Sequence, residues 1–426
     1  MKRLVFSAFV LALWSGSAFG QEVILSQVSK HQEMGEGKQA GEAWVVADPR
    51  DPQKLVVIWL ATRGGLAGTV MSPDVGYCGI GRTTDGGRTW SHERAPYRGY
   101  DNDVVSSQLP ICGDPAGGIL SDGSIVFTAI LLGHRDWVQS ITSTDNGATW
   151  STPTAPFSLD QWVLAIGESG RPQDMGPGRQ WLAVDPVLNH VYVQSQVDAA
   201  TFGRTMTVST DAGATWSVPR NVGSTSLGPI GAAHGKVAGV FSQGAERIFQ
   251  TSTDKGETWE RNPMPVGEGA GRGFVAADRT TPDRFAVLLT RGSDTLEVWV
   301  TTDAGVTVEN WTHRRTFTVA ELGEGANFSR PWIAYGPHGE LGVVWRYHYA
   351  DGSYDVDGVV SLDGGTTWKA PVRLTAPRGP APSGNLGSDD CACNLHLSGS
   401  TLSTTWGDWT TGHRELWFGS FEYGTE

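Results

Sequence analysis

Two arginines and two aspartates are the residues of this sequence that best suit acid–base chemistry on an anionic ligand. Arg330 and Arg346 flank a predicted hairpin over residues 331–345, so both should emerge at the same end of it. Asp114 begins the second of a series of repeats, and Asp408 lies in a loop of the last. Guanidinium groups bind carboxylates through paired hydrogen bonds, and two carboxyl groups can act as acid and base. We therefore predict Asp114 and Asp408 as catalytic residues, and Arg330 and Arg346 as ligand-binding residues.

Aromatic and imidazole side chains adjoin these charged groups. Tyr347 and His348 follow Arg346, and Trp409 follows Asp408. Rings with a polar edge pack against ligands and still make a hydrogen bond, so we predict that Tyr347, His348 and Trp409 contact the ligand. Two alternatives stay open. The charged groups form structural ion pairs that order the inner strands, or the loop residues are simply solvated.

A six-residue repeat, Asp-x-Gly-x-Thr-Trp, supplies the framework that must position these residues; each copy is called a box below. The Asp carboxylate can accept hydrogen bonds from turn N–H groups, the Gly can adopt a positive φ, and the Trp can bury its ring between sheets. Five complete copies exclude a chance match and predict a series of hairpins. The complete boxes begin at Asp85, Asp145, Asp211, Asp254 and Asp363, and a degenerate box begins at Asp303, with Trp311 three positions late.

Short strands rich in Val, Trp and Tyr alternate with the boxes. Residues 43–49 and 54–59 form one pair of predicted strands, and residues 180–186 and 190–193 form another. Two such strands followed by a box hairpin make four strands per unit, with the box between the third and fourth strands, which is typical of a β-propeller blade. The sequence predicts an all-β propeller of seven four-stranded blades, with six blades as the alternative.

The last predicted unit has three strands and no box. Residues 22–26, near the start of the chain, form a strand without an assigned partner. If this strand paired with the last unit, beside Trp417, it would close the ring and remove its exposed edges. We therefore predict a single propeller domain over residues 21–426.

The first twenty residues carry the pattern of a secretory signal peptide. Lys2 and Arg3 precede an apolar run over residues 4–14 and a small-residue run that ends at Gly20. The apolar run is too short for a transmembrane helix, and no later segment approaches the required length of about 20 residues. We expect residues 1–20 to be a cleaved signal peptide and the protein to be secreted or periplasmic, without a membrane anchor.

Four cysteines suit an exported protein stabilised by disulfides. They are Cys78, Cys112, Cys391 and Cys393, and four cysteines allow three pairings. The predicted strand order places all four near one face, in blades that adjoin the ring closure. The alternative is a thiolate metal site that includes His396, although the C-x-C spacing is not that of a zinc finger. We expect disulfides and no bound transition metal.

The charge balance excludes polyanionic partners. The formal net charge is −13, and no block of basic residues is present. We therefore expect no binding to nucleic acid, while a local basic pocket stays open. We also expect no cofactor and a monomeric protein. Asp355 and Asp357 could contribute to a structural calcium site, but calcium needs about six to eight oxygen ligands.

The boxes resemble the Asp-box, or BNR, repeats of the sialidase-like superfamily, from about residue 42 to residue 368. The resemblance implies a propeller with a glycan site at its central mouth and with the boxes on the opposite face. The Phe/Tyr-Arg-Ile-Pro motif of sialidases is absent near the start, so no catalytic residue is carried over. We expect binding of acidic sugars, by a glycoside hydrolase, by a polysaccharide lyase that uses His348 with Tyr347 or Tyr349, or by a non-catalytic glycan- or protein-binding propeller.

Overall fold

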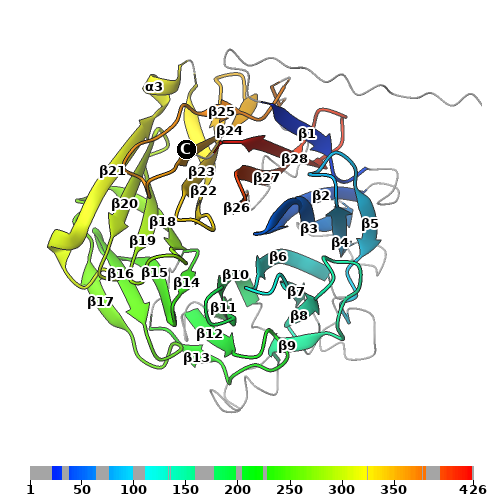
Figure 1. Ribbon diagram of the computed structural model, residues 1–426, viewed down its shortest axis with the longest axis horizontal. Coiled ribbons are helices and arrows are strands. Elements are labelled where there is room, and N and C mark those ends of the chain that lie inside the picture. Colours follow the sequence, from blue (N-terminus) through cyan, green and yellow to red (C-terminus); the bar gives the residue numbers. More distant parts are fainter. Residues whose placement is uncertain are drawn as a thin grey trace, which may run out of the picture.

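Seven four-stranded antiparallel sheets stand around a central axis in the computed structural model (Figure 1). The structure describes residues 22–30, 38–63, 76–98, 111–132, 134, 136–158, 177–197, 204–223, 228–323, 325–376, 378–379 and 394–424. The prediction of seven blades is confirmed, and the alternative of six is wrong. The predicted signal peptide, residues 1–20, lies outside the described residues.

The first four blades follow one another along the chain, each from the axis outward. Blade 1 contains β2 (Lys38–Asp48), β3 (Asp51–Arg63), β4 (Gly76–Thr83) and β5 (Ser91–Arg94). Blade 2 contains β6 (Ile111–Ile119), β7 (Ile125–Leu132), β8 (Val138–Ser143) and β9 (Thr154–Phe157). Blade 3 contains β10 (Pro177–Asp185), β11 (His190–Val197), β12 (Arg204–Ser209) and β13 (Arg220–Asn221). Blade 4 contains β14 (Gly231–Ala233), β15 (Lys236–Gln243), β16 (Glu246–Ser252) and β17 (Glu260–Pro263).

The last three blades complete the ring. Blade 5 contains β18 (Ala270–Ala277), β19 (Phe285–Arg291), β20 (Thr295–Thr301) and β21 (Trp311–Thr318), with a 3-10 turn η1 (Val308–Asn310) before β21. A short helix, α3 (Val319–Leu322), leads to blade 6, which contains β22 (Asn327–Tyr335), β23 (Leu341–His348), β24 (Tyr354–Ser361) and β25 (Val372–Arg373). Blade 7 contains β26 (Leu395–Ser398), β27 (Thr401–Asp408), β28 (Glu415–Glu422) and, as its outer strand, β1 (Val23–Gln27).

Pairing of β1 with β28 closes the ring. Val23 lies opposite Phe421 and Gln27 opposite Trp417 in an antiparallel ladder. The Val28 N–H extends the ladder by donating to the Leu416 carbonyl at 2.7 Å. The predicted closure by the two ends of the chain is therefore confirmed, with the strand shifted one residue from the predicted residues 22–26.

Middle strands are apolar on both faces because each blade is packed between two others. In β23, Val343 belongs to the core shared with blade 5, whereas the next residue, Val344, belongs to the core shared with blade 7. Both side chains are fully buried. Successive residues of a strand point to opposite faces, so a strand with two buried faces must be apolar without alternation.

Each box is a compact hydrogen-bonded turn between the third and fourth strands of its blade. In the second box, the Asp145 carboxylate accepts the Thr149 hydroxyl at 2.6 Å, the Thr149 N–H at 2.8 Å and the Ser143 hydroxyl at 2.8 Å. The Ser143 hydroxyl in turn accepts the Gly147 N–H at 2.8 Å. Asn146 and Gly147 have φ of 58° and 75°, which a glycine adopts without steric cost. The predicted roles of the Asp and the Gly are confirmed.

The box tryptophans join neighbouring blades. The indole N–H of Trp90 donates to Ser26 of blade 7 at 3.0 Å, that of Trp150 donates to Glu93 of blade 1 at 2.9 Å, and that of Trp216 donates to Thr154 of blade 2 at 3.0 Å. Each bond runs from one blade to the outer strand of the blade before it. The rings are half-buried rather than enclosed. They lie at the rim, where one edge of each ring contacts the neighbouring outer strand.

A disulfide joins Cys78 of β4 to Cys112 of β6 and so connects blades 1 and 2. This is one of the predicted pairings; Cys391 and Cys393 lie outside the described residues. Among the residues that the structure describes, no helix is long and apolar enough to cross a membrane. The same residues contain no group of three His, Cys, Asp or Glu side chains able to hold a metal ion.

Acid should loosen the box hairpins together. Hydrogen bonds from the Thr149 hydroxyl and N–H lower the pKa of Asp145 to about 2. Burial by itself raises the pKa of Asp254, but hydrogen bonds from Thr258 outweigh this effect and lower the pKa to about 2. Because these values lie below the value of about 3.9 for unfolded Asp, the bonds stabilise the fold above about pH 4 and are lost as the pH falls toward 2.

The melting temperature should therefore stay level down to about pH 4 and then decrease. The measurement is thermal unfolding followed by circular dichroism across this range. Asp145→Asn removes one titrating box and should make the decrease shallower, although the variant is less stable near neutral pH. A melting temperature that does not change between about pH 4 and pH 2 would contradict this account of the boxes.

Candidate functional site

The innermost strands of five blades carry a β-bulge near the mouth of the ring, the end at which these strands begin. In each, two residues oppose one residue of the second strand: residues 42–43, 114–115, 179–180, 271–272 and 330–331. Glu42, Asp114 and Arg330 sit at the first bulge position with φ of 54°, 44° and 50°. This backbone conformation costs a residue with a Cβ roughly 1–2 kcal/mol. Strain of this kind persists where a side chain must be aimed in a particular direction, which is typical of functional sites.

Hydrogen bonds connect the bulges of neighbouring blades. The Glu42 carboxylate of blade 1 accepts the Asp114 N–H of blade 2 at 2.7 Å. The Gln180 side chain of blade 3 donates to the Asp114 carbonyl at 3.0 Å. The bulge of blade 2 is thus fixed from both sides, so that the Asp114 backbone has little freedom to relax.

An aromatic plug fills the centre of the ring beneath the bulges. It consists of Trp44, Trp181, Phe274 and Trp332, which belong to blades 1, 3, 5 and 6. The centroid of the Trp332 ring lies 5.0 Å from that of Trp44, 5.9 Å from that of Trp181 and 5.6 Å from that of Phe274. These blades are not all neighbours, so the contacts bridge the axis. The plug forms the floor of the mouth.

In blades 1, 3 and 6 the first bulge residue lies two positions before Trp44, Trp181 or Trp332, at about 7 Å along an extended strand. The sequence contains a signal for two of the bulges that the hairpin pattern alone missed. Pro115 and Pro331 follow Asp114 and Arg330 inside strands that are otherwise central. Proline donates no hydrogen bond, so within a sheet it is confined to edges, strand starts and bulges.

Three of the predicted site residues come together in blade 6. The positive charges of Arg346 and Arg330 both disfavour the protonated form of the His348 imidazole. The Nε2 of this ring lies 2.6 Å from the Ser329 hydroxyl. Burial, followed by these two guanidinium groups, lowers the pKa of His348 to about 4. The imidazole is therefore neutral near pH 7, and can accept or donate a hydrogen bond without adding to the positive charge.

Arg346 and Asp408 lie in the contact between blades 6 and 7 rather than at the open mouth. Arg346 is 2% exposed; its guanidinium lies 4.9 Å from the centre of the Tyr354 ring and donates to the Gly407 carbonyl at 3.2 Å. Asp408 is 4% exposed and accepts the Tyr354 hydroxyl at 2.8 Å and the Thr410 N–H at 2.6 Å. This arrangement has the features of the structural alternative considered for these residues.

Tyr347 and Trp409 are also buried. Tyr347 is 1% exposed, and its hydroxyl donates to the Val319 carbonyl at 3.1 Å and accepts the Gly325 N–H at 2.6 Å. This hydroxyl joins the loop that contains α3 to blade 6. Trp409 is 8% exposed, and its carbonyl accepts the Gly412 N–H in a tight turn.

A second polar cluster occupies the start of β24. The Asp355 carboxylate lies 3.0 Å from Arg373 and accepts the Tyr349 hydroxyl at 2.6 Å, while Asp357 lies 3.4 Å from Arg373. Burial raises the pKa of Asp357 to about 6, although Arg373 opposes this. Asp355 and Asp357 were predicted as loop residues of the ligand-binding face that could contribute to a calcium site; in the structure the positive charge beside them is the Arg373 guanidinium.

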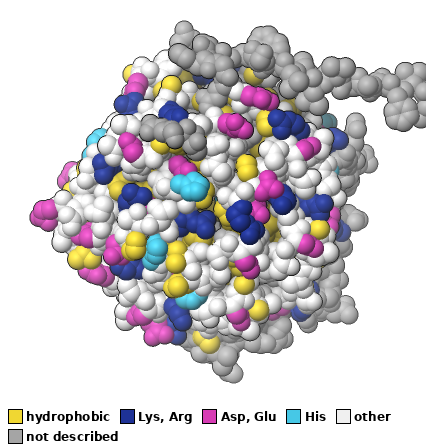
Figure 2. Space-filling model, in the orientation of Figure 1, with side chains coloured by type: hydrophobic (Ala, Val, Ile, Leu, Met, Phe, Trp, Pro, Cys, Tyr) yellow, Lys and Arg dark blue, Asp and Glu magenta, His cyan; other side chains and the backbone are white. Residues whose placement is uncertain are grey.

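Charges of both signs are interspersed over the face seen down the ring, without a large patch of one sign (Figure 2). Selectivity for an anion must therefore come from local geometry rather than from a broad electrostatic field. The arginine at the first bulge position of blade 6 supplies such a local feature.

The chain was compared with family models, curated sequences and solved structures. No family model matches the chain, and no curated protein sequence matches it. Among solved structures, the chain is similar to the Hadza microbial sialidase Hz136, with 15% identity over 94% of this chain and 95% of that chain and a TM-score of 0.49.

Two further solved structures have the same kind of likeness. One is the intramolecular trans-sialidase from Ruminococcus gnavus, with 13% identity over 72% of this chain and 90% of that chain and a TM-score of 0.44. The other is the alpha-L-arabinofuranosidase from Fusarium graminearum, with 12% identity over 76% of this chain and 93% of that chain and a TM-score of 0.46. At these identities no residue role passes from them to this chain.

Glycine and alanine should have opposite effects at the bulge and beside it. Arg330 has a positive φ, so Arg330→Gly should be more stable than Arg330→Ala by about 1 kcal/mol. Ser329, the preceding strand residue, has no such φ, so Ser329→Ala should be more stable than Ser329→Gly by roughly 0.5–1 kcal/mol. Urea unfolding of the four variants measures both differences. If alanine is the more stable of the two residues at both positions, the bulge is not strained.

Removal of the two arginines should have unequal effects on stability. Arg346→Ala leaves a cavity beside Tyr354 and removes one of the two donors to the buried Gly407 carbonyl, so it should lower the free energy of unfolding by about 3 kcal/mol. Arg330→Gly should change it by less than about 1 kcal/mol. Chemical denaturation compares the two variants, and equal losses would show that both arginines belong to the scaffold.

Proposed function

We propose that this protein is an exported propeller that binds acidic glycans at the mouth of its ring. The observation that carries the proposal is the set of charged residues held at strained bulge positions, Glu42, Asp114 and Arg330, above the aromatic plug. Backbone strain of this kind persists where the surrounding structure fixes it, and it is concentrated where a side chain must be aimed at a ligand. Export is supported by the signal-like start of the sequence and by the disulfide.

The mouth combines the groups that an acidic sugar needs. The Arg330 guanidinium offers a planar pair of donors that matches a carboxylate. His348 is neutral and adds a hydrogen-bonding group without repelling the arginine. Trp332 is the partly exposed residue of the plug, and aromatic ring faces are the surfaces against which sugar rings pack. In this arrangement Arg330 recognises the charge, and the floor supports the ring.

Cleavage is the second part of the proposal. Glu42 and Asp114 are the carboxyl groups that the bulges of adjacent blades bring together, with the Glu42 carboxylate fixed on the Asp114 N–H. Asp114 is half-buried, whereas Asp408 is enclosed by its bonds to Tyr354 and Thr410. We therefore retain Asp114 as the candidate acid or base, treat the buried Glu42 as the residue that positions it, and assign Asp408 the role of ordering the contact between blades 6 and 7.

A glycan panel tests the proposal. The protein over residues 21–426 is titrated with sialylated oligosaccharides, uronate oligosaccharides and neutral oligosaccharides, and affinity is measured by calorimetry. Arg330→Gly keeps the backbone unstrained and should weaken binding of the acidic members by about tenfold or more, since a charge-assisted pair is lost. Arg220→Gln, at the outer rim, should leave affinity unchanged.

The same panel separates the kinds of activity. Release of reducing sugar that Asp114→Asn abolishes indicates a hydrolase, unsaturated uronate that His348→Ala abolishes indicates a lyase, and neither product indicates a binding protein. No affinity for any acidic glycan, or full affinity in Arg330→Gly, contradicts the mouth as an acidic-sugar site.

A further inference from the structure

A second candidate site lies at the outer rim, far along the blades from the axis. It is a cavity of about 290 Å³ between β21 of blade 5 and the box hairpin of blade 6. Its volume equals that of about ten water molecules in the liquid. The lining residues are Arg314, Arg315, Phe317, Thr366, Trp368, Lys369 and Pro371. We call it the basic groove, because three of the seven are cationic and none is acidic.

A bulge turns two consecutive arginines into the basic groove. Along β21, Arg315 lies opposite Val298 and His313 opposite Trp299, so that Arg314 is the extra residue of the bulge. Neighbouring residues of a regular strand point to opposite faces, but a bulge re-aims one of them. Arg314 and Arg315 therefore line the same cavity.

The guanidinium of Arg314 has bonding capacity left over. Its Nη1 donates to the Thr366 hydroxyl at 3.3 Å. Its Nε is buried and has no hydrogen-bond partner among the described residues. Arg315 forms an ion pair with Glu321, and Lys369 donates to the Tyr423 carbonyl.

Aromatic side chains form the apolar part of the basic groove. The rings of Phe317 and Trp368 meet edge to face, with centroids 5.5 Å apart. The indole N–H of Trp368 donates to the Gly365 carbonyl at 3.0 Å. Trp368 is half-buried, so it offers ring surface to a ligand rather than its polar edge. The combination of ring surface and cations suits a ligand that has an apolar face and an anionic group.

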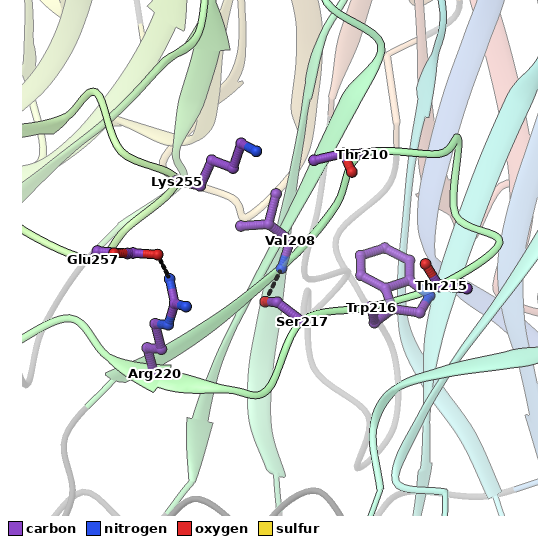
Figure 3. A pocket seen from close by; sticks show the side chains of 8 residues that line it. All are labelled: Val208, Thr210, Thr215, Trp216, Ser217, Arg220, Lys255 and Glu257. Carbon is purple, nitrogen blue, oxygen red and sulfur yellow. Dashed lines mark hydrogen bonds and ion pairs between the residues drawn. The ribbon is translucent and has the colours of Figure 1, made fainter.

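A groove between blades 3 and 4 provides an internal comparison (Figure 3). It has a volume of about 350 Å³ and likewise lies where the outer strand of one blade meets the box hairpin of the next. Its Arg220 is neutralised by Glu257 at 2.8 Å, on opposite sides of the groove (Figure 3). The location between blades therefore does not create a basic site by itself; the lining of the basic groove does.

We propose that the basic groove binds a saccharide that carries an oxyanion, either a sulfate ester or a carboxylate. The oxyanion lies against Arg314 and Lys369, and the sugar ring packs on Trp368. The site is separate from the mouth and does not depend on the function proposed for it. A protein of formal net charge −13 repels polyanions in general. The local cations and ring together therefore select a saccharide that bears a single charge.

Titration with defined saccharides tests the basic groove. The probes are glucose 6-sulfate, glucuronic acid, unmodified glucose and inorganic sulfate, each measured by NMR or calorimetry against the protein over residues 21–426. We expect the charged sugars to bind, glucose not to bind, and inorganic sulfate to bind about tenfold more weakly than glucose 6-sulfate, because it lacks the ring contact. The affinity of the charged sugars should fall as salt rises from about 0.05 to 0.5 M.

Variants place the site on the chain. Arg314→Gln should weaken the charged sugars by about tenfold or more, and Arg314→Lys by less, because lysine keeps the charge but loses the planar fork. Trp368→Phe should weaken the sugars but not inorganic sulfate. Arg220→Gln, in the comparison groove, should have no effect on this binding, while thermal melting confirms that each variant is folded.

Three results would overturn the proposal. The first is no binding of either charged sugar. The second is equal affinity for inorganic sulfate and glucose 6-sulfate, which would indicate a simple anion site. The third is equal or tighter binding of a short oligoglutamate peptide, which would indicate an acidic protein as the partner. Loss of binding in Arg330→Gly with full binding in Arg314→Gln would assign the saccharide to the mouth instead.

Discussion

Convergence of seven innermost strands on one axis is the constraint on which the rest of this structure depends. Those strands leave a space that the aromatic plug fills, and Trp332 touches rings from three other blades to do so. The bulges before Trp44, Trp181, Phe274 and Trp332 let each strand turn an aromatic ring toward the axis and a polar residue toward the mouth within three positions. A regular strand, with its period of two, would send both to the same face.

Around this centre, stability is distributed from blade to blade. The box turns hold their own blades, the indole N–H groups of Trp90, Trp150 and Trp216 each bond to the blade before, and the disulfide joins blades 1 and 2. Every such contact is local to two blades, so loops at the mouth are free to vary in sequence without weakening the scaffold. The same distribution explains why a residue at a blade-to-blade contact, such as Arg346, serves packing more readily than it serves a ligand.

The fold could be predicted from the sequence because its signals are local. A box is complete within six residues, and the missing outer strand of blade 7 follows from the absence of a box there. The bulges are tertiary features, and the sequence indicates only two of them, through the prolines of Asp114-Pro115 and Arg330-Pro331. Burial of Tyr347 and Asp408 depends on which face of a blade meets its neighbour, and no periodicity specifies that. The two arginines of the basic groove were missed because a bulge, invisible in the pattern, sets their direction.

Closure of the ring has a consequence for the timing of its assembly. Val23 pairs with Phe421, so about 400 residues must be added before β1 meets its partner. A ribosome that adds about 5 to 20 residues per second needs roughly 20 to 80 s for that length. Throughout this interval β1 presents open N–H and C=O groups, to which the edge of another chain can pair. The sequence of β1 must therefore meet two demands, to pair with β28 at the end and to stay unpaired until then, and its polar Ser26 and Gln27 suit the second.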